Sequence, residues 1–478
     1  MTYLSRGEYH TFAAADRQFL YLVPSAAVFA LDEPAQALLD ALADRPLPRQ
    51  ELLDTMSARF PDLDLDQTLE ELEQVQAIRL TSNVGPAPVI PLTPVPAVPS
   101  VPLTTAVLNV TNQCNLSCGY FYEYSEDKIV DTATGAQPKF MSEETACQGI
   151  DLLMNESGDN RVVHVSFFGG ETLMNYPVLR RVVPYARAQA SARHKHVEFN
   201  LTTNATLLTE DMINFLADED IAVTVSMDGP RELQNRFRVF HDGSPSYDVV
   251  LPRVKALLAR HHSRPIGARV TLTSQVSDVV TIFRHLTDEI GFQEVGFAPV
   301  TTSPNRDHAL DGSGFDHMVG QFKTLANEFL EAAATDRHHG FSNVSETLEE
   351  IHKGASKAYP CGAGLGLVGV ATGGDVALCH RFAGSDDHKL GSVSEGLDRE
   401  AQTQFLERHH LANKPDCHSC WARPLCSGGC YHEAHTRYGT STHANLHYCD
   451  WIREWTDVCL RIYGELAERN PAFLSRFD

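Results

Sequence analysis

Nine of the eleven cysteines lie in two arrays whose spacing is typical of metal binding. The first array is the pair Cys114 and Cys118. The second comprises Cys361, Cys379, Cys417, Cys420, Cys426, Cys430 and Cys449. Its central part has the spacing C-x2-C-x5-C-x3-C, which core packing does not explain and which points several thiolates at a metal. The second array therefore predicts metal sites, with zinc and iron–sulfur clusters as the two candidates.

Other residues able to bind a ligand follow predicted strands in the middle of the chain. They are Gly169, Gly170 and Glu171 after one strand, then Asn204, Ser226 and Arg238 after the next two. Two glycines let a ligand lie against the backbone, and a carboxylate can receive a cationic amine. An amide and a hydroxyl can hydrogen-bond a ribose, and a guanidinium can pair with a carboxylate. Each motif alone would suit an ordinary turn, but their repetition at successive strand ends predicts one binding site.

The elements that must position these residues alternate between strand and helix. Apolar β-rich runs are expected at Ala106–Val110, Val162–Phe168, Val197–Thr202, Ala222–Ser226, Ala268–Thr273 and Glu294–Val300, with helices at Glu143–Met154, Pro177–Ala190, Thr209–Leu216, Val249–His261 and Val279–Ile290. Such alternation predicts a parallel sheet with right-handed crossovers. Six units would form an open, partial (β/α)6 barrel, in which functional residues gather at the C-terminal ends of the strands.

The remaining sequence divides around this α/β barrel, which we expect over residues 104–310. Residues 1–82 predict a small α+β module with strands at Tyr9–Phe12, Phe19–Val23 and Ala27–Ala30 and helices at Glu33–Leu42, Arg49–Arg59 and Leu65–Gln76. Residues 83–103 are a proline-rich linker. A helical connector is expected at 311–354, a cysteine-rich domain of metal-stapled loops at 355–460, and a C-terminal helix or tail at 461–478.

Composition narrows the class of protein. The chain is 43% hydrophobic, and its net charge of −23 argues against a nucleic-acid partner, because phosphate binding requires Lys and Arg. Neither a membrane-spanning run nor a signal region is evident, which predicts a cytoplasmic protein that does not interact with membranes. Thiols stay reduced in that compartment, so the cysteine spacing favours metal over disulfides.

These motifs together resemble the radical S-adenosylmethionine (radical SAM) superfamily, specifically its SPASM peptide-maturase branch. In that family a C-x3-C-x2-C loop holds a [4Fe–4S] cluster, here beginning with Cys114 and Cys118, and the GGE motif at residues 169–171 clamps the methionyl ammonium of S-adenosylmethionine (SAM). The stretch Asp228-Gly229-Pro230 followed by Arg238 also fits the branch, although Gln234-Asn235 replaces the usual His-Asp.

The second array resembles the SPASM pattern, which implies two auxiliary [4Fe–4S] clusters. By that resemblance Cys417, Cys420, Cys426 and Cys449 form a complete site, whereas Cys361, Cys379 and Cys430 give three ligands to the other. The second cluster then has a non-cysteine ligand or an open iron for a substrate thiolate. His380, next to Cys379, is a candidate catalytic residue, as a ligand or a proton-transfer group. Zinc remains the alternative, because its sites also use C-x2-C spacing.

The N-terminal module resembles the winged-helix-like peptide-recognition element of many peptide maturases, which catches a leader segment as an added strand. Together with Cys379-His380-Arg381-Phe382, it most resembles the maturases of quinohaemoprotein amine dehydrogenase, which form intra-peptide thioether bonds. The resemblance implies that SAM is cleaved to a 5′-deoxyadenosyl radical that removes a substrate hydrogen, after which a cysteine sulfur bonds to that carbon. It also implies a small Cys-containing protein or peptide substrate with a leader, and a reducing electron donor.

The sequence departs from the family at Phe121, where the third cysteine of the loop is expected. Phenylalanine has no donor atom, and oxygen ligands from Tyr122 or Glu123 suit such a cluster poorly. Three explanations are open: an engineered inactive variant, a natural homologue that lost SAM cleavage, or an unusual ligand. The alternative functions are a non-catalytic iron–sulfur scaffold that binds a leader peptide, and another SPASM-type peptide modification.

Overall fold

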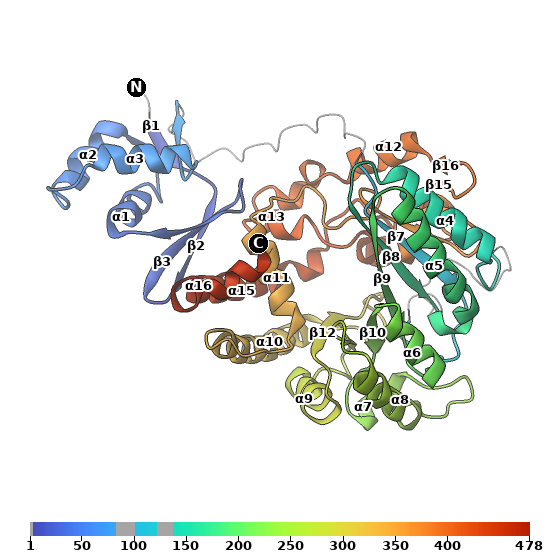
Figure 1. The fold of residues 1–478 in the computed structure, drawn as a ribbon. Helices are drawn as coiled ribbons and strands as arrows, with labels where there is room; N and C mark the ends of the chain where they lie inside the picture. Colours follow the sequence, from blue (N-terminus) through green and yellow to red (C-terminus); the bar gives the residue numbers. More distant parts are fainter. Residues whose placement is uncertain (1–2, 83–100, 122–136) are drawn as a thin grey trace.

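A computed structural model describes residues 3–82, 101–121 and 137–478. Figure 1 shows an N-terminal module, a central α/β region and a C-terminal segment. A small N-terminal module lies to one side of a large α/β region, and the C-terminal segment packs between and around them. The proline-rich stretch and the residues after Phe121 fall largely outside the described ranges, so the predictions for Tyr122, Glu123 and most of the linker are not addressed by the structure.

The N-terminal module contains two small antiparallel sheets and three helices. One sheet has the order β2-β3-β4, and the other has the order β5-β1-β6. The bounds are β1 Tyr3–Arg6, β2 Tyr9–Ala14, β3 Arg17–Leu22, β4 Val28–Leu31, α1 Glu33–Ala41, β5 Leu47–Pro48, α2 Arg49–Ser57, α3 Leu65–Gln74 and β6 Ile78–Thr81. The three expected strands and three expected helices are present. The second sheet was not predicted, because its strands of two to four residues are too short to show a period.

One ten-stranded sheet forms the centre of the molecule, with the order β12-β11-β10-β9-β8-β7-β13-β14-β15-β16. Its first six strands are parallel, as the sequence predicts: β7 Thr105–Thr111, β8 Val162–Gly169, β9 His196–Thr203, β10 Ala222–Ser226, β11 Gly267–Leu272 and β12 Glu294–Pro299. Because all six run the same way, their C-terminal ends meet at one edge of the sheet.

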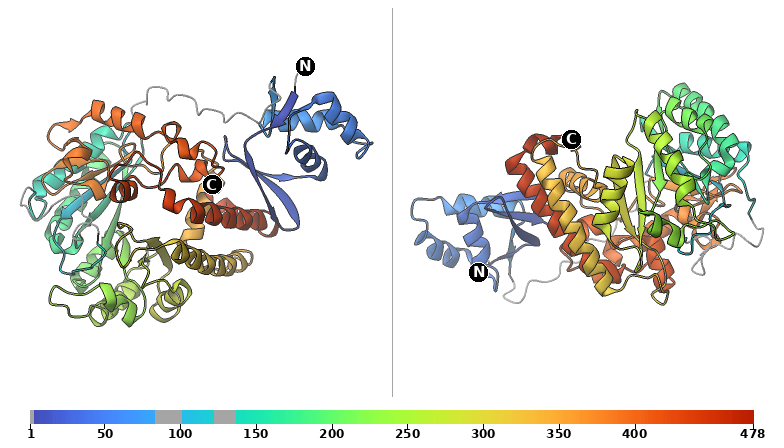
Figure 2. Two further views of the ribbon diagram at one scale, coloured as in Figure 1. Left: turned by 180° about the vertical axis from the view of Figure 1, so that it is seen from behind. Right: turned by 90° about the horizontal axis from the view of Figure 1, so that it is seen from below.

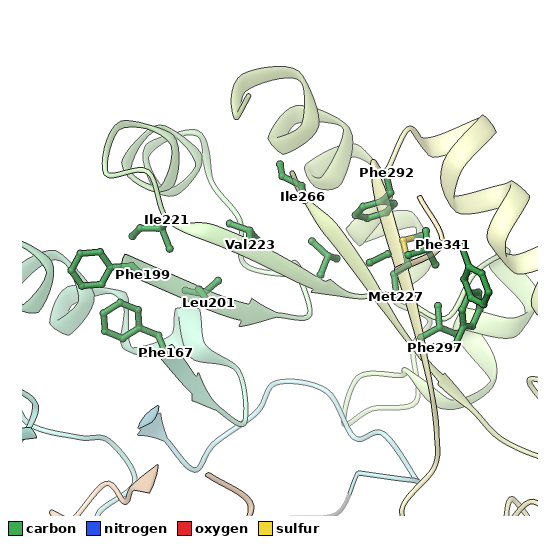
Figure 3. Close-up of a cluster of buried hydrophobic side chains, with 14 of the residues drawn as sticks. Phe167, Phe199, Leu201, Ile221, Val223, Met227, Ile266, Phe292, Phe297 and Phe341 are labelled. Atoms are coloured by element: carbon green, nitrogen blue, oxygen red, sulfur yellow. The ribbon is translucent and has the colours of Figure 1, made fainter. Parts of the chain in front are cut away.

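Helices cover one face of these strands: α4 Glu143–Glu156, α5 Tyr176–Ala192, α6 Glu210–Asp218, α7 Arg231–Phe237, α8 Tyr247–Arg260 and α9 Val279–Arg284. Several begin at a side-chain cap, as where Ser142 accepts from Thr145 N at the start of α4. Side chains alternate along each strand, so Phe167, Leu201 and Val223 enter the apolar core under the helices (Figure 3). Their neighbours Phe168, Thr202 and Thr224 instead face the opposite side, where they line a cavity.

The cysteine-rich segment extends the same sheet instead of forming only loops. Strand β13 Leu367–Val370 pairs parallel to β7, and β14 Asp375–Ala377, β15 Lys389–Ser392 and β16 Gly396–Leu397 continue it antiparallel. Helices α10 Gly312–Ala333 and α11 Ser342–Lys353 form the expected connector, and α12 Arg399–His409, α13 Arg423–Cys426, α14 Tyr431–Tyr438, α15 Cys449–Arg469 and α16 Pro471–Leu474 follow. The domain boundary predicted at residue 460 falls inside α15.

The N-terminal module packs against α15 and against the loop that carries three of the cysteines (Figure 2). Gly464 of α15 faces Ala14, and a Cβ added there would lie 2.9 Å from the Ala14 Cβ. At the loop, Glu8 forms an ion pair with Arg423, and the His10 ring stacks on Trp421 with centroids 3.8 Å apart. None of the helices in the described ranges combines the length and the apolar character that crossing a lipid bilayer requires.

Candidate functional site

Residues from four successive strand ends meet around one cavity of about 60 Å³. The loop after β7 contributes Cys114 and Cys118, and the ends of β8, β9 and β10 and the segment after α7 contribute the rest of the predicted set: Gly169, Gly170, Asn204, Ser226 and Arg238. Burial raises the pKa of Cys114 to about 12, so this thiol needs a metal or a cation to ionise. The structure thus brings together residues that are far apart in the sequence.

Glu171 lies behind the wall of this cavity instead of lining it. Its buried carboxylate accepts hydrogen bonds from Leu173 N (3.0 Å), Thr203 Oγ1 (2.7 Å) and Asn204 N (2.7 Å). Burial raises the pKa of Glu171, and these hydrogen bonds oppose the shift. The carboxylate therefore fastens the end of β8 to the end of β9, and the backbone of Gly169 and Gly170 is what faces the cavity.

Arg238 lines the cavity but is already paired inside the protein. Its Nε and Nη2 donate to the two oxygens of Asp228 at 2.9 and 3.2 Å, and Asp228 also accepts from the Tyr120 hydroxyl and from Thr271 N. Burial alone would lower the pKa of Arg238, but Asp228, Tyr120 and Cys118 together outweigh burial and raise it. The sequence prediction missed Asp228 as the partner of this guanidinium; its place two residues beyond the end of β10 was the available signal.

Phe121 stands at the cavity where the sequence motif would place a third cysteine. Its backbone N donates to Cys118 O at 3.0 Å, which turns the chain back toward the cavity, and its side chain lines the wall. Among the described residues the loop therefore offers two thiols and one phenyl ring. This donor set does not complete the ligands of a three-cysteine cluster.

A larger cavity of about 490 Å³ adjoins the first and shares five lining residues with it: Phe121, Phe168, Thr202, Ser226 and Arg238. His380 lines this cavity, with its ring centroid 4.3 Å from that of Phe168. Burial lowers the pKa of His380 to about 3, and the neighbouring Arg381 adds to the shift, so the ring is neutral near pH 7.

Two arginines of this cavity were missed at the sequence level. Arg381 lines the wall and donates to Thr301 Oγ1 at 2.9 Å, and Arg269 projects from β11. Arg269 is the charged residue within the otherwise uncharged strand β11. This departure was the available signal, because alternate positions of a strand face the same side.

Four cysteines of the second array surround a separate cavity of about 60 Å³. They are Cys417, Cys420, Cys426 and Cys449, the set that the resemblance assigns to one cluster. Burial raises the pKa of Cys417 to about 12, and the neighbouring Cys426 thiol adds to the shift. Among the described residues, no group of three or more His, Cys, Asp or Glu side chains is arranged to hold a single metal ion. Four soft donors around a hollow instead fit a four-iron cluster.

The remaining three cysteines form a second group beside the first. Burial raises the pKa of Cys379 to about 12, and Cys430 and Cys361 add to it electrostatically, which places the three thiols near one another. Asn109 Nδ2 of β7 donates to His380 O at 3.1 Å, so the segment after Cys379 is fastened to the barrel. The three-cysteine group therefore lies next to the larger cavity.

Comparisons with known proteins agree with this geometry. Residues 108–290 match the family model of the radical SAM superfamily. The serine-type anaerobic sulfatase-maturating enzyme of Bacteroides thetaiotaomicron is 26% identical over 346 residues, which cover 66% of this chain and 80% of that protein.

Two solved structures share the fold. Native anSMEcpe with bound AdoMet superimposes with a TM-score of 0.64 at 19% identity, covering 77% of this chain and 99% of that one. Streptococcus suis SuiB bound to the precursor peptide SuiA gives 0.50 at 14% identity, covering 93% and 99%. The chain therefore carries a radical SAM enzyme domain over residues 108–290 and resembles peptide-modifying maturases.

Proposed function

We propose that this chain is a SPASM-type peptide maturase for intra-peptide thioether bonds, which join a cysteine sulfur of a ribosomally made protein to a side-chain carbon. The observation that carries the proposal is the position of the three-cysteine group. Cys379 directly precedes His380, and His380 lines the cavity shared with the SAM-facing residues. A substrate cysteine on the incomplete cluster would thus lie next to the substrate carbon in the barrel.

The protein residues have distinct tasks in this proposal. When bound, SAM and a barrel cluster supply the radical that removes a hydrogen atom from the substrate. Gly169, Gly170, Asn204 and Ser226 bind SAM, and Glu171 holds the glycine backbone in place. His380 would serve as a neutral ligand or hydrogen-bond partner near the substrate, because its lowered pKa makes it a weak base. The four-cysteine site would hold an auxiliary cluster, because four thiols line its cavity.

Phe121 implies that the chain as written cleaves little or no SAM. We would compare the parent protein with Phe121→Cys, using Phe121→Ala as the control that removes the ring without adding a thiol. Phe121→Cys should gain about four irons per chain and release 5′-deoxyadenosine, whereas the parent and Phe121→Ala should not. Equal release by the parent and Phe121→Cys would refute the proposed role of Phe121.

The thioether assignment needs a substrate, and a small cysteine-rich protein that co-purifies with the chain is the candidate. After incubation with Phe121→Cys, SAM and a reductant, the substrate should lose two hydrogens in mass and one thiol available for alkylation. A substrate in which the cysteine is replaced by serine should not lose them. Loss of mass from that control would point to another SPASM-type modification.

The N-terminal module supplies the leader-binding site in this proposal. β4 is an edge of its sheet, and Phe29 on that strand is 43% exposed. An edge strand can pair with an extended leader, while an exposed aromatic side chain gives it an apolar contact. Replacing Phe29 with aspartate should weaken leader binding, measured by fluorescence anisotropy, without changing SAM binding.

A second candidate is a non-catalytic iron–sulfur scaffold that binds a leader peptide and presents the substrate to another enzyme. The observation that favours it is the phenyl ring at the cavity, which leaves the loop with two thiols. Peptide binding without SAM turnover, even in Phe121→Cys, would support the scaffold over the maturase.

A further inference from the structure

Lys414 is a buried cation that the proposed reaction does not use. It is 2% exposed and ranks among the largest fully buried side chains. Its Nζ donates to Ser427 O at 3.3 Å and lies 5.3 Å from the centroid of the Tyr431 ring. Within the described residues, no Asp or Glu side chain forms an ion pair with it. An ammonium buried with so few partners needs anions nearby, because an uncompensated buried charge is strongly unfavourable.

The cysteines of both groups would supply that negative charge as the thiolate ligands of the proposed clusters. Burial lowers the pKa of Lys414, and four thiols oppose the shift: Cys417 and Cys426 from one group, Cys361 and Cys430 from the other. Lys414 O also accepts from Cys417 N at 2.9 Å, which fixes the lysine at the start of the four-cysteine loop. Lys414 Nζ reaches Ser427 O, next to Cys426, and the ring of Tyr431, next to Cys430, so the side chain lies between the two groups.

The fold makes room for this lysine. A Cβ at Gly428 would lie 2.7 Å from Lys414 Cδ and 2.8 Å from its Nζ, and Gly428 has a φ of +85°. Only a glycine at that turn lets the ammonium pass over the backbone between Cys426 and Cys430. The glycine turn between Cys426 and Cys430 therefore leaves the space that the Lys414 side chain occupies.

We propose that Lys414 is a counter-ion shared by the two auxiliary clusters and that it raises the reduction potential of both. The inference rests on the clusters of the proposed function. One-electron reduction adds one negative charge to a cluster, and a fixed positive charge in a poorly screened interior stabilises the reduced form. A single cation beside both clusters would therefore make each one easier to reduce.

The test is an EPR-monitored redox titration of the iron-loaded full-length protein with dithionite. Lys414→Met should lower the reduction equilibrium constant of both clusters at least tenfold, which corresponds to about 59 mV for a one-electron couple. The matched control is Lys357→Met. Lys357 acts on Cys361 and is paired with Glu350 at the surface, so its removal should shift the three-cysteine cluster alone, and by less.

Each other outcome also decides the inference. If Lys414→Met leaves both potentials unchanged, or shifts only one, Lys414 is not a shared counter-ion. If that variant does not take up iron, Lys414→Arg decides, because it keeps the charge and should hold both potentials within threefold of the parent equilibrium constants. A large shift of both in Lys414→Arg would overturn the inference. Iron and sulfide counts on the parent protein test the proposed function separately from this inference. A parent protein without the two auxiliary clusters would overturn the proposed function itself.

Discussion

Removing the guanidinium of Arg238 should destabilise the protein by about 3–5 kcal/mol. Asp228 is fully buried and accepts two of its four hydrogen bonds from Arg238. In Arg238→Met the Asp228 carboxylate keeps Tyr120 and Thr271 as donors but has no compensating charge. The Arg238 side chain is only 8% exposed, so water does not screen the loss. Because Tyr120 belongs to the loop of Cys118, the same change should loosen the cavity lined by Cys114 and Cys118.

The assay is urea unfolding followed by circular dichroism, with two comparisons. Arg231→Met removes the partner of Asp248 from an ion pair whose side chains are 56% and 58% exposed, and it should cost at most about 1 kcal/mol. The double variant Arg238→Met with Asp228→Asn should be more stable than Arg238→Met alone, because no buried charge remains unpaired. The reasoning is refuted if Arg238→Met costs no more than Arg231→Met, or if the double variant is the less stable one.

Two further predictions concern stability. Gly464→Ala should destabilise the contact between α15 and the N-terminal module by about 1–3 kcal/mol, because the added methyl group meets Ala14. Gly320→Ala, in the exposed middle of α10, should instead stabilise the protein by about 0.5–1 kcal/mol. A higher melting temperature for Gly464→Ala than for Gly320→Ala would contradict this prediction. Burial lowers the pKa of His409 to about 4 from an ordinary 6.5, so only the unfolded chain takes up this proton as the pH falls through that window. Stability should fall by about 2 kcal/mol there in the parent and by less in His409→Gln, as measured by urea unfolding at a series of pH values.

The parallel sheet could be predicted from the sequence because each strand is a short apolar run followed by a helical period. The alternation within β8 even separates Phe167, which enters the core, from Phe168, which lines the cavity. The convergence of the strand-end motifs also follows from the sequence, because parallel strands bring their C-terminal ends together.

Other features depend on tertiary contacts that no local pattern records. The type of Glu171 suggested a ligand contact, but three donors from neighbouring strand ends turn its carboxylate inward. The pairing of β13 with β7 joins residues far apart in the chain, and four residues of strand carry too little periodicity to reveal it. Lys414 resembles any loop lysine in the sequence, and its burial appears only when both cysteine groups are folded around it.

The contact of the N-terminal module with the loop of residues 417–426 couples the docking of the module to the ordering of that loop. Arg423 lies between Cys420 and Cys426 and pairs with Glu8, while Trp421 stacks on His10. Any change that reorganises this loop, such as oxidative loss of the proposed cluster, should also weaken the docking of the module by the same free energy that docking contributes to the loop. Under the proposed function, oxygen damage to the four-cysteine cluster would then release the module proposed to bind the leader, so a protein that had lost this cluster would also bind its peptide less tightly.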